Sequence, residues 1–246
     1  MKKIHLIMPM GGSGTRFGTK GYTLPKPLIE LQGRPFFFWA AQSVYKFVEV
    51  EDLIFIVLQE HIDKYSIDKE IQKYYPNAVI QVLPHVLNGA VLTCCEGVKA
   101  VNDDLPLLFN DCDHAFICDA FYAYCRQGDY NKIDGALLTF PSNRPNYSYV
   151  KFDSAGNVSG TVEKIVVSNE AICGAYYFKS KTIFQNAVKM YLKRCQYNEF
   201  FISGVYNELY HQDGRIRTFP VNAHISFGTP EEYDLAINDE RLGKLA

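Results

Sequence analysis

The sequence predicts an α/β fold in which helices flank a mixed, mostly parallel central sheet, in a Rossmann-like arrangement. Two observations favour this fold class. In the first half of the chain, short apolar runs alternate with segments of helical length, which is typical of parallel strands joined by helices. In the second half, several strand-length runs follow one another with turns between them. With 246 residues, of which 48% are hydrophobic, the chain can bury a sizeable core.

The first half is expected to contain three successive β-α units. The first strand covers residues 4–8, and a helix follows at 35–47. Further buried strands are expected at 53–59, 78–83 and 106–110, because these runs are apolar and too short for helices. Helices should separate them at about 61–74 and 89–101.

After Asp134 the pattern changes to consecutive strands. Strand-like runs cover 135–140, 148–153, 158–164 and 172–178, and a turn at 154–157 joins the second run to the third. Helices are expected at 180–194 and 198–211, and two more strands at 216–221 and 225–227. Thr229 precedes Pro230 and two glutamates, the pattern of an N-cap and a first helical turn. A last helix should therefore begin at Pro230.

Composition and charge exclude several broad classes of protein. A net charge of -2 and a pI near 6.3 give no general attraction for nucleic acid or for an anionic membrane. No apolar run approaches the roughly 20 residues of a membrane span, and the apolar start is too short for a signal peptide. Seven cysteines without a CxxC pair fit buried thiols in a reducing compartment. We expect a cytoplasmic protein that binds small molecules, without nucleic-acid binding or membrane insertion.

A glycine-rich loop (residues 10–18) follows the first strand. Glycines let backbone amides approach phosphate oxygens and form an anion-binding concavity. Between residues 10 and 29 there are three cations, Arg16, Lys20 and Lys26, and no acidic residue. The loop therefore predicts a polyphosphate site. Its expected nucleotide-binding residues are Met10, Gly11, Gly12, Ser13, Gly14, Thr15 and Arg16.

The spacing in this loop excludes two common phosphate motifs. A Walker A sequence, GxxxxGK[ST], is absent, and the GxGxxG fingerprint fails because Phe17 stands at the third glycine. A glycine-rich turn with solvated lysines is the structural alternative. Arg16 and the segment Pro25-Lys26-Pro27 favour a binding site over that alternative.

These residues resemble the sugar-phosphate nucleotidyltransferases and the related cytidylyltransferases. The hallmark of that family is GxG[ST]R, followed some ten residues later by PKP and a hydrophobic pair. Gly12-Ser13-Gly14-Thr15-Arg16 and Pro25-Lys26-Pro27-Leu28 match it. The resemblance implies a GT-A-like nucleotidyltransferase fold. It also implies that the loop and Arg16 hold the triphosphate, while Lys26 contacts the phosphates being joined.

The resemblance also implies a base-binding segment and a metal site. Asn88-Gly89-Ala90 matches the family segment that contacts the nucleotide base, with Gly89 as its binding residue; helix capping by Asn88 is the alternative. The family carries a metal-binding aspartate after a buried strand, which aligns with Asp113. Asp111 is the second expected ligand, since Mg²⁺ that bridges phosphates needs only one or two carboxylates. Helix capping by an aspartate is the structural alternative here.

The acceptor side resembles the same family. Glu163-Lys164 matches its EK pair, in which the lysine grips the acceptor phosphate, and Tyr176 lies in a match to its GxYxF strand. The segment 198–208 is similar to one found in a family branch of surface-polysaccharide gene sets. One position departs from the pattern, because Ser226 stands where many relatives have a second metal-binding aspartate. His224 is a poor substitute, since Mg²⁺ disfavours nitrogen ligands.

The implied reaction joins the nucleotidyl group of a triphosphate (CTP, UTP, dTTP or GTP) to a phosphorylated acceptor and releases pyrophosphate. Arg16, Lys26, Lys164 and Mg²⁺ bound to Asp113 would neutralise charge in this reaction. The resemblance implies one domain, 1–246, with a nucleotide-binding half at 1–133 and an acceptor-binding half at 134–246. The acceptor is a sugar 1-phosphate, as expected for polysaccharide or capsule precursors, or a small phosphorylated amino compound. Assembly into a homo-oligomer stays open.

Three alternatives remain at this point. A cytidylyltransferase for a non-sugar phosphate such as phosphocholine fits the aromatic second half of the chain. A nucleotide-sugar-dependent glycosyltransferase would use Asp111-Cys112-Asp113 as a DxD motif, but has no triphosphate for the glycine-rich loop to hold. A catalytically silent nucleotide sensor is suggested by Ser226 alone.

Overall fold

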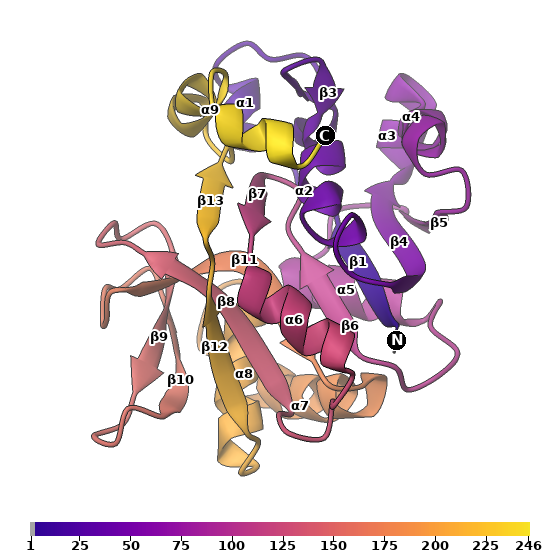
Figure 1. Ribbon diagram of the computed structural model, residues 1–246. Helices are drawn as coiled ribbons and strands as arrows, with labels where there is room; N and C mark the ends of the chain where they lie inside the picture. Colours follow the sequence, from indigo (N-terminus) through magenta and orange to yellow (C-terminus); the bar gives the residue numbers. More distant parts are fainter. Residues whose placement is uncertain (1–2) are drawn as a thin grey trace.

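Four parallel strands form the first part of the central sheet in the computed structural model, which describes residues 3–246. β1 (Ile4–Pro9) lies between β4 (Val50–Leu58) and β6 (Leu107–Asn110), and β5 (Val79–Leu83) lies outside β4. All these pairs are parallel, so the carboxyl ends of β1 and β6 meet at the same edge of the sheet (Figure 1). The first two residues of the expected nucleotide-binding half lie outside the described residues.

β11 (Glu170–Phe178) joins the second half of the chain to the first. It runs antiparallel to β6 on one side and to β8 (Gly135–Pro141) on the other. β12 (Ile216–Pro220) extends the sheet parallel to β8, and the hairpin of β9 (Ser148–Phe152) and β10 (Val158–Glu163) pairs with the start of β11. The expected α/β fold with a mixed, mostly parallel sheet flanked by helices is confirmed.

Helices cover both faces of this sheet, and each face has its own apolar cluster (Figure 1). Successive side chains of β1 alternate between the two clusters, as the period of a strand requires. One cluster includes α5 (Ala90–Val98), α7 (Lys181–Arg194) and α8 (Ile202–His211). The other includes α2 (Phe36–Tyr45), α4 (Ile67–Tyr74), α6 (Asp119–Gln127) and α9 (Pro230–Ala236).

Short elements complete the chain around these layers. A two-stranded antiparallel sheet of β7 (His114–Ile117) and β13 (Ala223–Ser226) lies below α9 in Figure 1. The remaining short elements are α1 (Thr15–Gly18), η1 (Lys26–Leu28), β2 (Glu30–Leu31), β3 (Arg34–Pro35), α3 (Gln59–Tyr65) and η2 (Glu240–Lys244).

Several expected elements differ in the structure. The helix expected at 61–74 is two helices, because Ser66 adopts a left-handed conformation with φ 51° and ends α3. The strand expected at 225–227 lies at 223–226, and β7 and α6 were not predicted. The last helix begins at Pro230 as predicted, and the Thr229 side chain accepts a hydrogen bond from the Glu232 amide.

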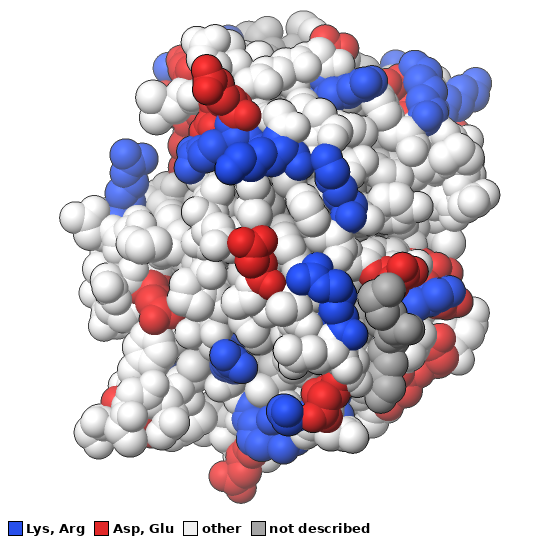
Figure 2. Space-filling model, viewed as in Figure 1, with Lys and Arg blue, Asp and Glu red and all other residues white. Residues whose placement is uncertain are grey.

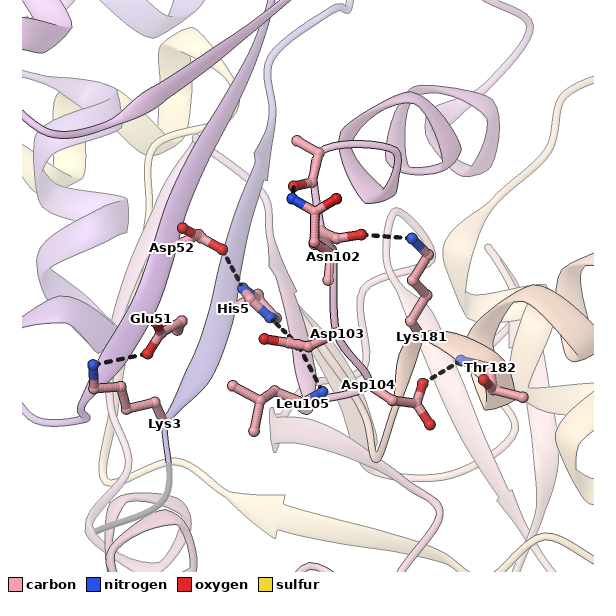
Figure 3. Close-up of polar contacts among 12 residues, drawn as sticks. Lys3, His5, Glu51, Asp52, Asn102, Asp103, Asp104, Leu105, Lys181 and Thr182 are labelled. Carbon is pink, nitrogen blue, oxygen red and sulfur yellow. Dashed lines mark hydrogen bonds and ion pairs between the residues drawn. The ribbon is translucent and has the colours of Figure 1, made fainter.

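A polar cluster ties the start of β1 to its neighbours, at the end of the strand away from the glycine-rich loop (Figure 3). The buried His5 ring lies 2.9 Å from Asp52 Oδ2 through Nδ1 and 2.8 Å from Asp103 Oδ1 through Nε2. Lys181 Nζ donates to the Val101 carbonyl oxygen at 2.6 Å. These contacts hold β4, the loop before β6 and the start of α7 against one strand end.

Surface and cysteine features accompany this fold. On the face seen in Figure 2, acidic and basic side chains are interspersed, without a broad basic patch among the described residues. Within residues 3–246, no helix is long and apolar enough to cross a membrane. All seven cysteines are free thiols, and five of them are buried.

Candidate active site

A polar cavity of about 210 Å³ lies where the carboxyl ends of β1 and β6 meet β11, the β7–β13 sheet and the start of α9. Open α/β sheets place ligands at this edge. The residues considered as site candidates from the sequence that line it are Arg16, Asp111, Asp113, Glu163, Tyr176, His224 and Ser226. The cavity is therefore formed by both halves of the chain.

The glycine-rich loop presents free amides beside this cavity. Met10 is buried and its amide donates to Ile56, while the exposed part of the loop begins at Gly12. Within the described chain, the N–H groups of Gly12, Ser13 and Gly14 donate no hydrogen bond. Gly14, with φ 60°, turns the chain into α1, which carries Thr15 and Arg16. Successive free amides in such a turn form an anion-binding concavity.

Gly11 fixes the base of this loop. A Cβ atom at Gly11 would lie 2.8 Å from Leu83 Cδ1 and 3.4 Å from Thr93 Cγ2, so the loop packs directly against the end of β5 and against α5. Only glycine permits so close an approach without displacing its neighbours.

Lys26 and Asp113 form an ion pair at the floor of the site. The Lys26 Nζ–Asp113 Oδ2 distance is 2.7 Å, and both side chains are about three-quarters buried. Burial would lower the pKa of the Lys26 ammonium, but the Asp113 carboxylate outweighs it and holds that pKa above its ordinary value. Burial would likewise raise the pKa of Asp113, and Lys26 holds it below its ordinary value. Both groups are therefore charged at neutral pH.

Asp111 lies beside an irregularity in β11. The register of β11 against β8 shifts between Ile172 and Tyr176, and Gly174 in this stretch has φ 86°. A Cβ at Gly174 would lie 3.0 Å from Asp111 Oδ2 and 2.9 Å from His114 Nε2. Burial, followed by repulsion from Asp113, raises the pKa of Asp111 to about 7. The strand irregularity thus makes room for a polar group, as bulges beside active sites commonly do.

The acceptor-side residues are divided between the cavity and its rim. Glu163 lines the cavity and accepts hydrogen bonds from the hydroxyls of Ser148 and Ser203. Lys164 lies at the rim: its Nζ is 4.8 Å from the centroid of the Phe201 ring, which lines the cavity, and 4.0 Å from Glu199 Oε1. Tyr176 contributes a largely buried wall.

Gly89 lies just outside the cavity, next to the lining residue Ala90. Its φ is 98°, and a Cβ would lie 2.3 Å from the Phe200 amide nitrogen. The Asn88 side chain does not cap α5, because Gly89 is the N-cap and no side-chain hydrogen bond is made there. Gly89 therefore has a structural role, because its close packing against the main chain at Phe200 leaves no room for a side chain.

Sequence reasoning missed His114 and Glu232, which line the cavity, and considered His224 and Tyr147 only as weak candidates. His114 is buried and His224 is partly buried, and His114 Nδ1 and Nε2 and His224 Nε2 have no hydrogen-bond partner in the described chain. Burial lowers the pKa of His114 to about 4, so its ring is neutral at physiological pH. Tyr147 donates a hydrogen bond to Glu232 Oε1 at 2.7 Å. No spacing signal could reveal that His114 and His224 are close together, because β7 and β13 bring them together from distant parts of the chain.

The carboxylates fit a hard divalent cation that is completed by a ligand. Among residues 3–246, no three side chains of His, Cys, Asp or Glu converge to hold a metal ion by themselves. Mg²⁺ in phosphate-transfer sites is bound through one or two carboxylates together with substrate phosphates and water. Asp113 lies in the cavity close to the glycine-rich loop, because a Cβ at Gly14 would contact Lys26 Cβ at 3.4 Å. The donor set is therefore compatible with an ion that arrives with a polyphosphate.

The sheet, the anion-binding loop and the acidic cavity define an α/β nucleotide-binding enzyme. Residues 5–229 match the model of a family described as nucleotidyl transferase. This match covers most of the chain, so the chain belongs to the nucleotidyl transferase family and is a nucleotidyltransferase that acts on a phosphorylated acceptor.

Solved structures share this fold. The chain is similar to a nucleoside-diphosphate-sugar pyrophosphorylase from Vibrio cholerae, with 24% identity and a TM-score of 0.81 over 95% of this chain and 100% of that one. It is also similar to the inositol-1-phosphate CTP transferase from T. maritima, with 12% identity and a TM-score of 0.76 over 96% and 95% of the two chains. No curated protein sequence matches this chain.

Proposed function

We propose that this enzyme transfers the nucleotidyl group of CTP, UTP, dTTP or GTP to a sugar 1-phosphate or to a small phosphorylated amino compound, such as phosphocholine. A phosphate oxygen of the acceptor attacks the α-phosphorus, the bond to the β-phosphate oxygen breaks, and pyrophosphate leaves. The proposed role is the synthesis of surface polysaccharide or capsule precursors in the cytoplasm. The observation that carries the proposal is the ion pair between Lys26 and Asp113, in which Asp113 lines the cavity and Lys26 lies next to a loop of free amides.

In this proposal the chain contributes positioning and charge rather than a covalent intermediate. The amides of residues 12–14 and Arg16 bind the triphosphate. Lys26 exchanges its ion pair with Asp113 for contact with the phosphates being joined. Asp113 would hold Mg²⁺, which neutralises phosphate charge when it is bound, and Asp111 lines the same cavity.

The two halves of the domain would divide the substrates between them. Residues 1–133 bind the nucleotide, and Gly89 contacts the base. Residues 134–246 bind the acceptor, with Lys164 at the rim toward its phosphate and Glu163 and Tyr176 toward the rest of the molecule. The two serine hydroxyls that donate to Glu163 fix its carboxylate in the cavity, which supports this arrangement.

A matrix of five triphosphates against phosphorylated acceptors, read by pyrophosphate release, tests this function. At least one pair should release pyrophosphate only when both substrates are present. Release of a free nucleoside diphosphate from a nucleotide sugar would instead favour the glycosyltransferase alternative. Nucleotide binding without turnover on every acceptor would favour a sensor.

Arg16→Ala tests the proposed triphosphate contact. Loss of one electrostatic donor should lower the rate roughly 10² to 10³-fold. Lys20→Ala is the matched control, because Lys20 follows closely in the sequence but does not line the cavity, and its side chain lies 3.9 Å from Glu231 Oε1. A loss under threefold in Arg16→Ala, or an equal loss in the two variants, would contradict the role given to Arg16.

A further inference from the structure

A second acidic side chain lies near Asp113, at a position where Gly228 has no side chain. Glu232, in the first turn of α9, lines the cavity and is 8% exposed. A Cβ atom at Gly228 would lie 2.7 Å from Asp113 Oδ2 and 3.5 Å from Glu232 Oε2. The two carboxylate oxygens therefore lie close to the same point in the cavity, next to Gly228.

Hydrogen bonds orient the Glu232 carboxylate and leave one of its oxygens without a donor in the described chain. Its Oε1 accepts from the Tyr147 hydroxyl at 2.7 Å, and its amide donates to Thr229 Oγ1 at 3.2 Å. Its Oε2 accepts no hydrogen bond from any residue between 3 and 246. Tyr147 and the start of α9 thus hold the carboxylate in place, while the oxygen nearest the Gly228 position is free for a ligand.

Negative charge exceeds positive charge around Asp113 and Glu232. Glu232 forms no ion pair within the part of the chain that the structure describes, whereas a buried carboxylate normally requires a cation or several donors. Lys26 is paired with Asp113 alone. The ring of His114, 3% exposed, lines the same cavity with both nitrogens unpartnered. A buried polar group without a partner in the protein marks a place where a ligand or water binds.

Asp111 faces a different part of the cavity. Its Oδ2 lies near the point that a Cβ at Gly174 would occupy, together with His114 Nε2, whereas Asp113 and Glu232 flank Gly228. The geometry therefore pairs Asp113 with Glu232 and leaves Asp111 beside the histidine.

We propose that Glu232 is the second carboxylate ligand of a divalent cation held by Asp113, in place of the carboxylate that Ser226 does not provide. This inference rests on the proposed function, because the phosphates of the nucleotide would complete the ion's oxygen ligands. Because the two oxygens lie 2.7 and 3.5 Å from the same point, both can approach one Mg²⁺ or Mn²⁺ ion bound at about 2.1 Å. Carboxylate and phosphate oxygens select a hard cation.

Titration of the full chain with Mn²⁺, with free Mn²⁺ measured by electron paramagnetic resonance and no nucleotide present, tests this assignment. Glu232→Gln keeps an oxygen that can accept from Tyr147 and removes the charge, so Mn²⁺ should bind at least tenfold more weakly. Glu231→Gln, on the exposed side of the same helical turn, is the matched control and should bind Mn²⁺ as the wild type does. Thermal unfolding of each variant shows that the chain remains folded.

A rescue variant makes the test independent of folding. Ser226 lines the same cavity, so Ser226→Asp in the Glu232→Gln chain should recover most of the lost Mn²⁺ affinity. Unchanged Mn²⁺ affinity in Glu232→Gln, or a failure of Ser226→Asp to restore it, would overturn the assignment. Unchanged affinity with a raised KM for the acceptor would also overturn it, and would make Glu232 an acceptor contact instead.

Pyrophosphate release, measured separately, distinguishes this inference from the proposed function. If the wild type releases pyrophosphate and Glu232→Gln binds Mn²⁺ normally, the function stands and the ligand assignment is wrong. If no substrate pair releases pyrophosphate but Glu232→Gln loses Mn²⁺ affinity that Ser226→Asp restores, the cation site stands and the proposed reaction is wrong.

Discussion

Gly228 offers a sharp test of how closely the site depends on its geometry, because replacing it by alanine adds a single methyl group. That methyl carbon would lie 2.7 Å from Asp113 Oδ2, well inside van der Waals contact. The backbone itself should tolerate the change, since Gly228 is not among the residues with positive φ. The expected disturbance is therefore confined to the Asp113 carboxylate and its partners.

The magnitude follows from this overlap. Restoring an ordinary contact requires a displacement on the order of 0.7 Å, and a misplacement of that size in an active site lowers turnover by roughly 10²-fold. The cost in stability should be smaller, about 1 kcal/mol, because the carboxylate can move into the adjoining cavity instead of straining a packed core. For a domain of this size, that corresponds to a decrease in Tm of roughly 2–4 °C.

Pyrophosphate release and thermal unfolding, measured on the same preparations, check this prediction. Gly243→Ala is the matched control, because a Cβ at Gly243 meets nothing within 4 Å and its φ is not positive. If Gly228→Ala turns over within twofold of the wild type and of this control, the reasoning from the position of Asp113 is refuted.

Two further predictions follow from burial and backbone geometry. Burial raises the pKa of Asp111 from 3.8 to about 7. Between pH 3.8 and about 7, the folded chain therefore keeps a proton on this carboxyl that the unfolded chain has lost. The free energy of unfolding consequently falls as the pH rises through this range. Asp111→Asn should therefore stabilise the protein more at pH 8 than at pH 5, by a few kcal/mol at most, when stability is measured by urea unfolding. An equal effect at the two pH values would argue against a raised pKa of Asp111. Gly89→Ala places a methyl 2.3 Å from a main-chain nitrogen and should cost more than roughly 2 kcal/mol, while Gly156→Ala, with similar positive φ but open space, should cost about 1 kcal/mol. Equal losses of stability in these two variants would show that conformation alone, not the contact, makes Gly89 necessary.

The fold was largely predictable because its strands carry clear apolar runs. The parallel strands β1, β4, β5 and β6 were all expected close to their observed bounds, since continuous apolar runs are typical of strands buried on both faces. β7 and α6 were not expected, because residues 111–127 mix acidic, aromatic and cysteine residues without a clear period of two or 3.6. Ser66 shows a second limit, since its polar neighbours continue the helical pattern while its left-handed conformation ends the helix.

The nucleotide side of the candidate site was predictable where the chain is locally continuous. The glycine-rich loop and Arg16 follow one strand directly, and Asp111 and Asp113 follow another, so strand order alone placed them at one edge of the sheet. Glu232 was noted only as part of a helix start. Its proximity to Asp113 depends on the pairing of β7 with β13, a contact between segments more than a hundred residues apart in the sequence.

The central position of β11 has a consequence for how the chain is made. β6 exposes an unpaired edge until β11, about sixty residues later in the sequence, has left the ribosome and paired with it. Unpaired edges of apolar strands are sites of non-native association. Separate expression of residues 1–133 should therefore give a fragment that aggregates, whereas co-expression with 134–246 supplies the missing strand. Residues 1–133 would then depend on residues 134–246 for their folding.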